Sequence, residues 1–163
     1  MVLLNSCRNE PSPARSTGNI RMMDDTILNY NRGIVRTEEQ EIADFIHRYG
    51  WKMTKTPTGL RYMIYKHGSG ERAMNGKKVT ILYEIRLLNG NLCYSSTQLG
   101  PKEFTTGRGK FESGAEEGIL LMKVGDRAKF IVPSHLAFGL LGDQDKIPPR
   151  STLIYDVELL KIN

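Results

Sequence analysis

The 163-residue sequence contains only two cysteines, Cys7 and Cys93, and three histidines, His47, His67 and His135. Two cysteines cannot form the dense disulfide framework of small secreted domains. The histidines lie far apart and lack the short spacing of paired zinc ligands, so we expect no metal site and no cofactor. No apolar run approaches the roughly 18 residues that a membrane-spanning helix needs, so we expect no membrane span.

The sequence also lacks the dense basic block that is typical of nucleic-acid binding. The net charge is +5, but residues 1–36 hold five arginines against three acidic residues, and residues 37–163 hold 18 basic against 15 acidic residues. Aromatic residues make up 8% of the chain and lie mostly at apolar strand positions rather than between basic residues. We therefore predict a mixed, solvated surface and no nucleic-acid partner.

The first seven residues resemble the end of a bacterial lipoprotein signal. Leu4-Asn-Ser-Cys7 combines an aliphatic residue, a spacer, a small residue and a cysteine whose thiol would carry the lipid. A full signal also needs a charged start and an apolar stretch of about 7–15 residues, and only residues 2–4 are apolar. Two interpretations are open: residues 1–7 are the remnant of a longer signal with Cys7 as lipid anchor, or Cys7 is a chance cysteine in a frayed terminus.

Residues 8–36 show no sustained apolar period and are rich in proline, serine, asparagine and glycine. Such a segment cannot bury enough apolar surface to order itself, so we predict a flexible linker. Behind a lipid anchor the linker would be a tether, and without one it would be a disordered arm.

A helix is predicted over residues 38–49, within an N-terminal segment of residues 37–56. Thr37-Glu-Glu-Gln40 matches a capping box with Thr37 as the N-cap, and Gly50 supplies the end. One apolar stripe is formed by Ile42, Phe45, Ile46 and Tyr49. We expect this stripe either to pack on the same domain or to mediate a dimer.

From residue 57 to residue 163 the apolar residues alternate with a period of two. The alternation predicts strands over residues 60–66, 79–88, 92–96, 128–132 and 153–159. Asn89-Gly90 predicts a two-residue type I′ hairpin turn, and residues 114–122 predict one short helix. These elements predict an α+β fold with a mainly antiparallel sheet. No catalytic motif stands out, so the residues alone indicate a soluble binding domain.

The segment from Val79 to Asn163 resembles the FK506-binding-protein family of peptidyl-prolyl isomerases. The resemblance rests on residues 88–96, Gly114-Ala-Glu-Glu-Gly118, residues 121–130, Pro133-Ser-His-Leu-Ala-Phe-Gly139, Lys146-Ile-Pro-Pro149 and residues 153–162. Cys7, the linker and residues 88–91 and 140–143 resemble one subgroup, the gliding-motility-associated isomerase lipoproteins of Bacteroidetes-type bacteria. The family fold is a bent antiparallel sheet wrapped around one short α-helix, with a ligand pocket between them. Beside this resemblance, the remnant of an export signal becomes the favoured interpretation of residues 1–7.

The resemblance implies cis-trans isomerisation of X–Pro bonds in proline-containing polypeptide clients of the cell envelope. The rotation barrier of about 18–20 kcal/mol comes from amide resonance, and a dry apolar pocket disfavours the planar, dipolar amide more than the twisted one. The implied location is the periplasm or the outer membrane. The only implied membrane contact is a lipid on Cys7.

Carried over from the family residue by residue, the implied catalytic residues are Tyr83, Phe138, Ile147 and Tyr155. Tyr83 matches a tyrosine of the pocket wall, and Tyr155 takes the floor position where phenylalanine is usual. Ile147 would supply a backbone N–H to a substrate carbonyl. Phe138 stands where a tyrosine hydroxyl usually holds the substrate.

The rest of the implied pocket departs from the family pattern at several positions. Its members are Cys93, Tyr94, Phe104, Phe111, Glu112 and Ala115, with Lys102 at the rim. Ala115 replaces the tryptophan of the pocket base and Tyr94 replaces an aspartate, so we expect reduced isomerase activity. Either Phe111 or Tyr94 refills the space left by the tryptophan, or the substituted residues repack as core. The alternative function is a non-catalytic peptide-binding or chaperone module.

Overall fold

The computed structural model describes residues 17–109 and 111–163, and the predicted lipid anchor Cys7 lies outside them. The chain divides after Thr37 into two compact units, of which Glu38–Asn163 is the larger. No helix in the described part of the chain is long and apolar enough to span a membrane. The elements are α1 (Thr17–Tyr49), β1 (Thr54–Lys55), β2 (Arg61–Lys66), β3 (Lys78–Leu87), β4 (Leu92–Ser95), α2 (Ser96–Leu99), β5 (Lys102–Thr105), α3 (Ser113–Leu120), β6 (Arg127–Val132), the 3-10 helix η1 (Ser134–Leu136) and β7 (Leu153–Ile162).

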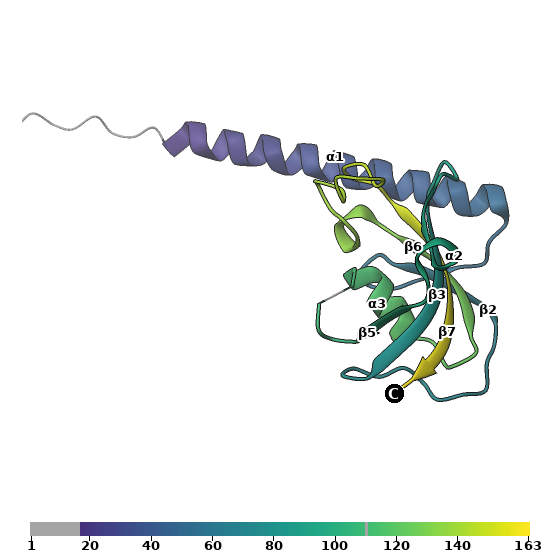
Figure 1. Cartoon of the computed structure of the whole chain (residues 1–163). Helices are drawn as coiled ribbons and strands as arrows, with labels where there is room; N and C mark the ends of the chain where they lie inside the picture. Colours follow the sequence, from purple (N-terminus) through teal and green to yellow (C-terminus); the bar gives the residue numbers. More distant parts are fainter. Residues whose placement is uncertain (1–16, 110) are drawn as a thin grey trace, which may run out of the picture. The chain divides into compact units, whose positions relative to one another are not determined.

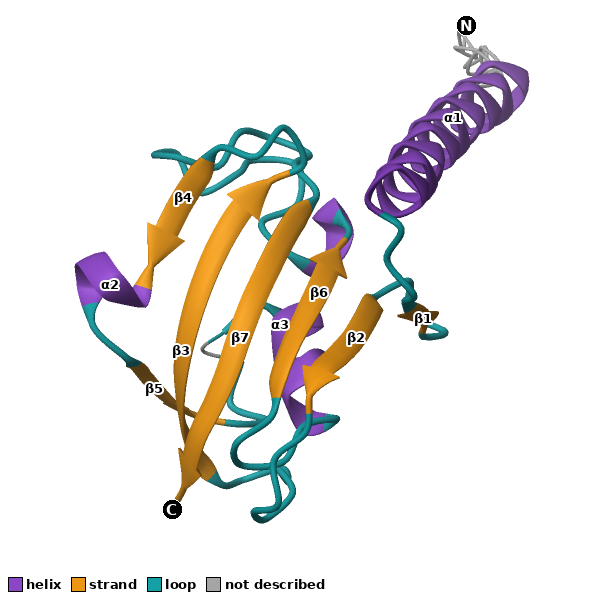
Figure 2. Ribbon diagram, turned by 90° about the vertical axis from the view of Figure 1, so that its right-hand side faces the viewer, coloured by secondary structure: helices purple, strands orange, loops and turns teal. Residues whose placement is uncertain are grey.

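The strands form one antiparallel sheet in the order β1-β2-β6-β7-β3-β4, with β5 also pairing with β3. Figure 2 shows β3 and β7 as the long central strands. In this register Tyr155 lies opposite Ile85 on one side and Phe130 on the other. This sheet, with the short helix α3 packed on it, confirms the predicted α+β fold.

The face of the sheet that packs on α3 carries the main core. Tyr155, Phe130 and Ile119 are fully buried there, and they belong to one cluster that also includes residues of β3, β5 and β6. Gly118 of α3 sits directly on Phe130, because a Cβ at this glycine would lie only 2.7 Å from the Phe130 ring. The close approach of helix and sheet therefore requires a glycine.

The opposite face of the sheet carries a second, smaller core. Ile42 and Phe45 of α1 pack against Ile131 of β6 and Ile154 of β7. The apolar stripe predicted from the sequence thus packs on its own domain rather than standing free. Tyr49 is the exception, since it is 57% exposed although its ring lies 4.5 Å from that of Phe45.

The start of α1 corrects the prediction for this region. The helix begins at Thr17, so residues 17–36 are helical where we predicted a linker, and residues 8–16 lie outside the described part (Figure 1). Thr37 is not an N-cap, because its hydroxyl donates to the Gly33 carbonyl inside the helix at 3.0 Å. No proline occurs between residues 14 and 56 to stop a helix, and an interior glycine such as Gly33 costs only about 1 kcal/mol.

The predicted capping box would place Glu38 in the first turn of a helix, but Glu38 lies in the middle of α1. Its Oε1 accepts hydrogen bonds from the Ser134 N–H and the Thr152 hydroxyl, each at 2.6 Å, and its Oε2 accepts from the Ser134 hydroxyl at 3.1 Å. One carboxylate therefore connects the helix to the segment after β6 and to the segment before β7.

The β3–β4 hairpin is present, but its turn differs from the predicted type I′. A type I′ turn needs positive φ at both central residues, and among the described residues Gly90 has a φ of 91° whereas Asn89 does not have a positive φ. The Gly90 N–H donates to the Leu87 carbonyl, and the Leu87 N–H donates to the Asn91 carbonyl. The connection is thus a three-residue loop closed by a glycine bulge, which the dipeptide signal alone does not distinguish.

Candidate functional site

The predicted site residues converge on the face of the sheet that packs on α3. Period-two alternation in β3 and β7 turns Tyr83 and Tyr155 to this face, and β4, β5, α3 and the loop after η1 supply the others. Seven of them are buried in one cluster, namely Tyr83, Cys93, Phe104, Phe111, Ala115, Ile147 and Tyr155, and Tyr94 and Phe138 pack against it half-buried. Glu112 stands immediately before α3.

Four rings define what we call the aromatic cluster: Tyr83, Phe104, Phe111 and Tyr155. Phe111 is its centre, since its ring stacks on Phe104 at 4.7 Å and meets Tyr155 edge-on at 6.2 Å. The Lys102 ammonium lies 4.6 Å from the centre of the Phe111 ring. Of the two residues expected to refill the space above Ala115, Phe111 is the one that contacts the floor tyrosine.

Tyr94 points instead toward the loop that follows η1. Its hydroxyl donates to Asp143 Oδ2 and, at 3.3 Å, to Asp145 Oδ2. The hydrogen bond to Asp143 is the main reason why the pKa of Tyr94 is raised. The Lys146 ammonium lies 5.1 Å from the centre of the Tyr94 ring. Tyr94 therefore holds this loop in place through hydrogen bonds to its two aspartates and a ring contact with Lys146.

Ile147 corrects one expectation about the site. Its backbone N–H, which the resemblance assigned to a substrate carbonyl, donates to Asp143 Oδ1 at 2.7 Å. The Asp145 N–H donates to the same oxygen at 3.0 Å, so the loop folds around its own carboxylate in the manner of an Asx turn. The Ile147 side chain, only 2% exposed, remains part of the apolar wall.

Tyr155 and Glu112 form the polar part of the site. Burial raises the pKa of Tyr155 well above its ordinary value, and the Glu112 carboxylate raises it further. Burial, followed by the same carboxylate, also raises the pKa of Tyr83. The sequence does not reveal this arrangement, because Glu112 and Tyr155 are 43 positions apart and neither belongs to a polar motif.

Cys93 is buried within the same cluster and is a free thiol. Burial raises its pKa, which disfavours the reactive thiolate. This environment is that of a small hydrophobic residue rather than a nucleophile. Among the described residues, no group of three or more His, Cys, Asp or Glu side chains could hold a metal ion.

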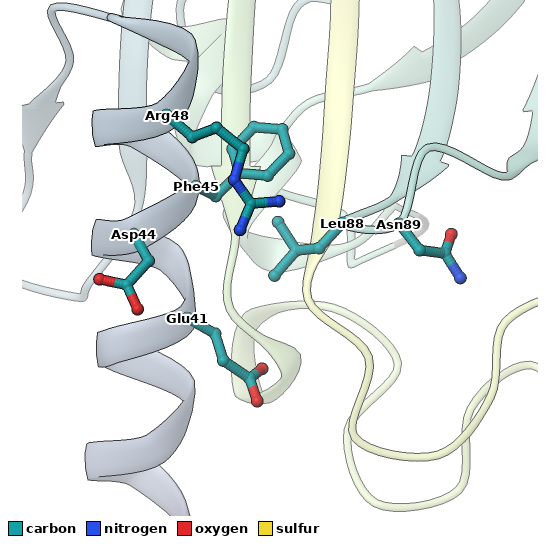
Figure 3. Close-up of a pocket in the computed structure, with 6 residues that line it drawn as sticks. All are labelled: Glu41, Asp44, Phe45, Arg48, Leu88 and Asn89. Carbon is teal, nitrogen blue, oxygen red and sulfur yellow. The ribbon is translucent and has the colours of Figure 1, made fainter.

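A cavity of about 270 Å³ lies between α1 and the β3–β4 hairpin. Figure 3 shows its six lining residues: Glu41, Asp44, Phe45, Arg48, Leu88 and Asn89. It contains none of the predicted site residues, and Phe45 places it beside the smaller core, on the other face of the sheet. Its mixture of two acids, one arginine and two apolar side chains points to no particular chemistry.

The loop around Asp143 gives a pH-dependent prediction. Burial alone would raise the pKa of Asp143, but hydrogen bonds from Tyr94 and from the N–H groups of Asp145 and Ile147 lower it below the ordinary 3.8. A lowered pKa adds stability above pH 4 that is lost as the pH falls through the folded-state pKa. We expect the stability difference between wild type and Asp143→Asn to be constant above pH 5 and to shrink below pH 4, as measured by urea unfolding. A difference that is unchanged at pH 3 would contradict the role of the charged carboxylate.

Comparison with known proteins gives a consistent result. The family model for FKBP-type peptidyl-prolyl cis-trans isomerase matches residues 69–160. The chain is 41% identical over 108 residues to a probable FKBP-type peptidyl-prolyl cis-trans isomerase FkpA of Neisseria meningitidis, covering 66% of this chain and 39% of that protein. It is 44% identical over 89 residues to the peptidyl-prolyl cis-trans isomerase Fkbp12 of Drosophila melanogaster, covering 54% and 82%. The chain thus spans well under half of the Neisseria relative.

Solved structures show the same fold. The crystal structure of FkpA from Escherichia coli superposes with a TM-score of 0.67 at 25% identity, covering 92% of this chain and 74% of that one. The crystal structure of AtFKBP13 superposes with a TM-score of 0.65 at 29% identity, covering 69% of this chain and all of that one. The chain belongs to the FKBP-type peptidyl-prolyl cis-trans isomerase family.

Proposed function

We propose that this chain catalyses cis-trans isomerisation of X–Pro bonds in polypeptide clients. The observation that carries the proposal is the aromatic cluster, whose four rings gather beside α3 with an apolar wall from Ile147. Apolar aromatic surroundings disfavour the planar, dipolar amide relative to the twisted one and so lower the barrier to rotation. The reaction needs no nucleophile, because no covalent bond breaks.

We further propose that the clients are cell-envelope proteins and that the protein acts in the periplasm or as an outer-membrane lipoprotein. The lipobox-like Leu4-Asn-Ser-Cys7 and the resemblance to gliding-motility-associated lipoproteins support this location. Ala115 and Tyr94 depart from the family pattern, and the Ile147 N–H is engaged by Asp143. These three features support activity below that of family members with the usual residues.

The test is a peptide isomerisation assay that uses Ala-X-Pro-Phe substrates with several X residues. We expect the wild-type chain to accelerate isomerisation above the uncatalysed rate. Ile147→Asp places a carboxylate in the apolar wall and should abolish the acceleration, with circular dichroism confirming that the variant is folded. Wild-type rates no higher than those of the folded variant would contradict the proposed isomerase activity.

The second candidate function is a non-catalytic peptide-binding or chaperone module. The engaged Ile147 N–H is the observation that favours it, because a substrate carbonyl cannot use this donor while Asp143 holds it. In that case the wild-type chain would suppress the aggregation of an unfolded client without accelerating X–Pro isomerisation.

A further inference from the structure

Two buried oxygen atoms of the candidate site lack a hydrogen-bond partner among the described residues. They are the Tyr155 hydroxyl and Glu112 Oε2. Tyr155 is fully buried on the central strand β7. Buried polar groups in folded proteins are almost always hydrogen-bonded, and these two oxygens influence each other, so a polar pair with spare hydrogen-bonding capacity lies inside the apolar site.

The surroundings of Tyr155 include four other site residues. The Phe111 ring meets Tyr155 edge-on at 6.2 Å. The charged or ionisable groups that influence the hydroxyl are Glu112, Cys93 and Tyr83. Phe111, Cys93 and Tyr83 belong to the core on the α3 side of the sheet, and Glu112 immediately precedes α3. The hydroxyl is therefore directed into the candidate site, away from the sheet face that carries Ile154 and Asp156.

We propose that the Tyr155 hydroxyl is a catalytic hydrogen-bond donor to the X–Pro amide of a bound peptide, a role that rests on the isomerase function proposed above. In the planar amide the nitrogen lone pair is delocalised and is a poor acceptor. As the bond twists, the nitrogen becomes pyramidal and its lone pair localises, so it can accept a hydrogen bond. A donor that is fixed in apolar surroundings stabilises this twisted state more than the planar one.

The environment of Tyr155 suits a donor that must stay protonated. Burial and the Glu112 carboxylate both favour the neutral phenol, so the hydroxyl keeps its proton throughout the physiological pH range. The proton remains on Tyr155 during the reaction, and no covalent bond forms or breaks. No hydrogen bond of ordinary length holds the hydroxyl among the described residues, but the Glu112 carboxylate attracts its proton, so a substrate amide competes with Glu112 for this donor.

The test is Tyr155→Phe, which removes one oxygen atom and preserves the ring. We expect kcat to fall about tenfold with KM unchanged, because the hydrogen bond forms only in the twisted state; this equals about 1.4 kcal/mol of barrier. The melting temperature should stay the same or rise, because a buried unpaired hydroxyl has been removed. Tyr62→Phe is the matched control, since Tyr62 of β2 packs at the margin of the core outside the site and should keep wild-type kcat.

The outcomes separate this role from the proposed function. An active wild type with an equally active Tyr155→Phe overturns the role of the hydroxyl and leaves the isomerase function standing. An inactive wild type overturns both. A kcat loss that is accompanied by a lower melting temperature also overturns the donor role, because the hydroxyl would then be a structural group.

Discussion

Replacing Phe111 by alanine is expected to lower kcat/KM for an X–Pro peptide about 100-fold, which corresponds to about 2.7 kcal/mol of transition-state stabilisation. Phe111 is the ring that joins Phe104 to Tyr155, and it is 7% exposed. Its neighbour in the first turn of α3, Ala115, has no side chain that could take its place. Truncation would therefore admit water beside the reacting amide and remove the apolar contact that favours the twisted state.

Phe45→Ala is the matched control for this experiment. Both substitutions truncate a phenylalanine that is 7% exposed, and each should reduce stability by about 3 kcal/mol or more. Phe45 packs in the smaller core on the other face of the sheet, away from the aromatic cluster. We expect Phe45→Ala to keep wild-type kcat/KM at a temperature where both variants are folded. Similar losses of activity in the two variants would show that Phe111 acts only through stability.

Replacing Glu38 by alanine is expected to reduce the free energy of unfolding by at least about 3 kcal/mol. Hydrogen bonds to a charged group contribute about 1.5–3 kcal/mol each, and the Glu38 carboxylate accepts three. Its loss leaves the Ser134 N–H and the Thr152 hydroxyl without this acceptor, and Thr152 is buried. The comparison requires urea unfolding of both proteins at pH 7.

Glu41→Ala provides the control, because Glu41 lies on the same helix and is exposed. It should change the free energy of unfolding by less than about 0.5 kcal/mol. If the two variants lose equal stability, the loss comes from a change in helix propensity and not from the hydrogen bonds that Glu38 makes.

The long strands and the short helix were predictable from the sequence because each carries its own periodic pattern. Alternation located β3 and β7 to within a few residues, and the helix predicted over residues 114–122 corresponds to α3. Strands β1 and β5 have only two and four residues, too few to show a period. The prediction of a capping box at Thr37 was wrong for a different reason. The same residues fit both a helix start and a helix interior, and whether the preceding residues are helical determines which of these applies.

The gathering of the predicted site residues in one cluster could be expected from the family resemblance, but their hydrogen bonding could not. A family pattern assigns Ile147 a free N–H, whereas the actual partner is a carboxylate four residues earlier. Likewise, a tyrosine at position 155 is visible in the sequence, but the sequence does not show that its hydroxyl lacks an ordinary hydrogen-bond partner among the described residues. Such features depend on distances between segments that local sequence does not encode.

The position of β7 in the middle of the sheet has an evolutionary consequence. Adjacent residues of this strand serve different cores: Ile154 packs under α1, and Tyr155 forms the floor of the aromatic cluster. A change in strand position that improves the packing of one face moves the other face by the same amount. We therefore expect substitutions in the α1 stripe and in the aromatic cluster to co-vary among relatives, although the two sets of side chains lie on opposite sides of the sheet.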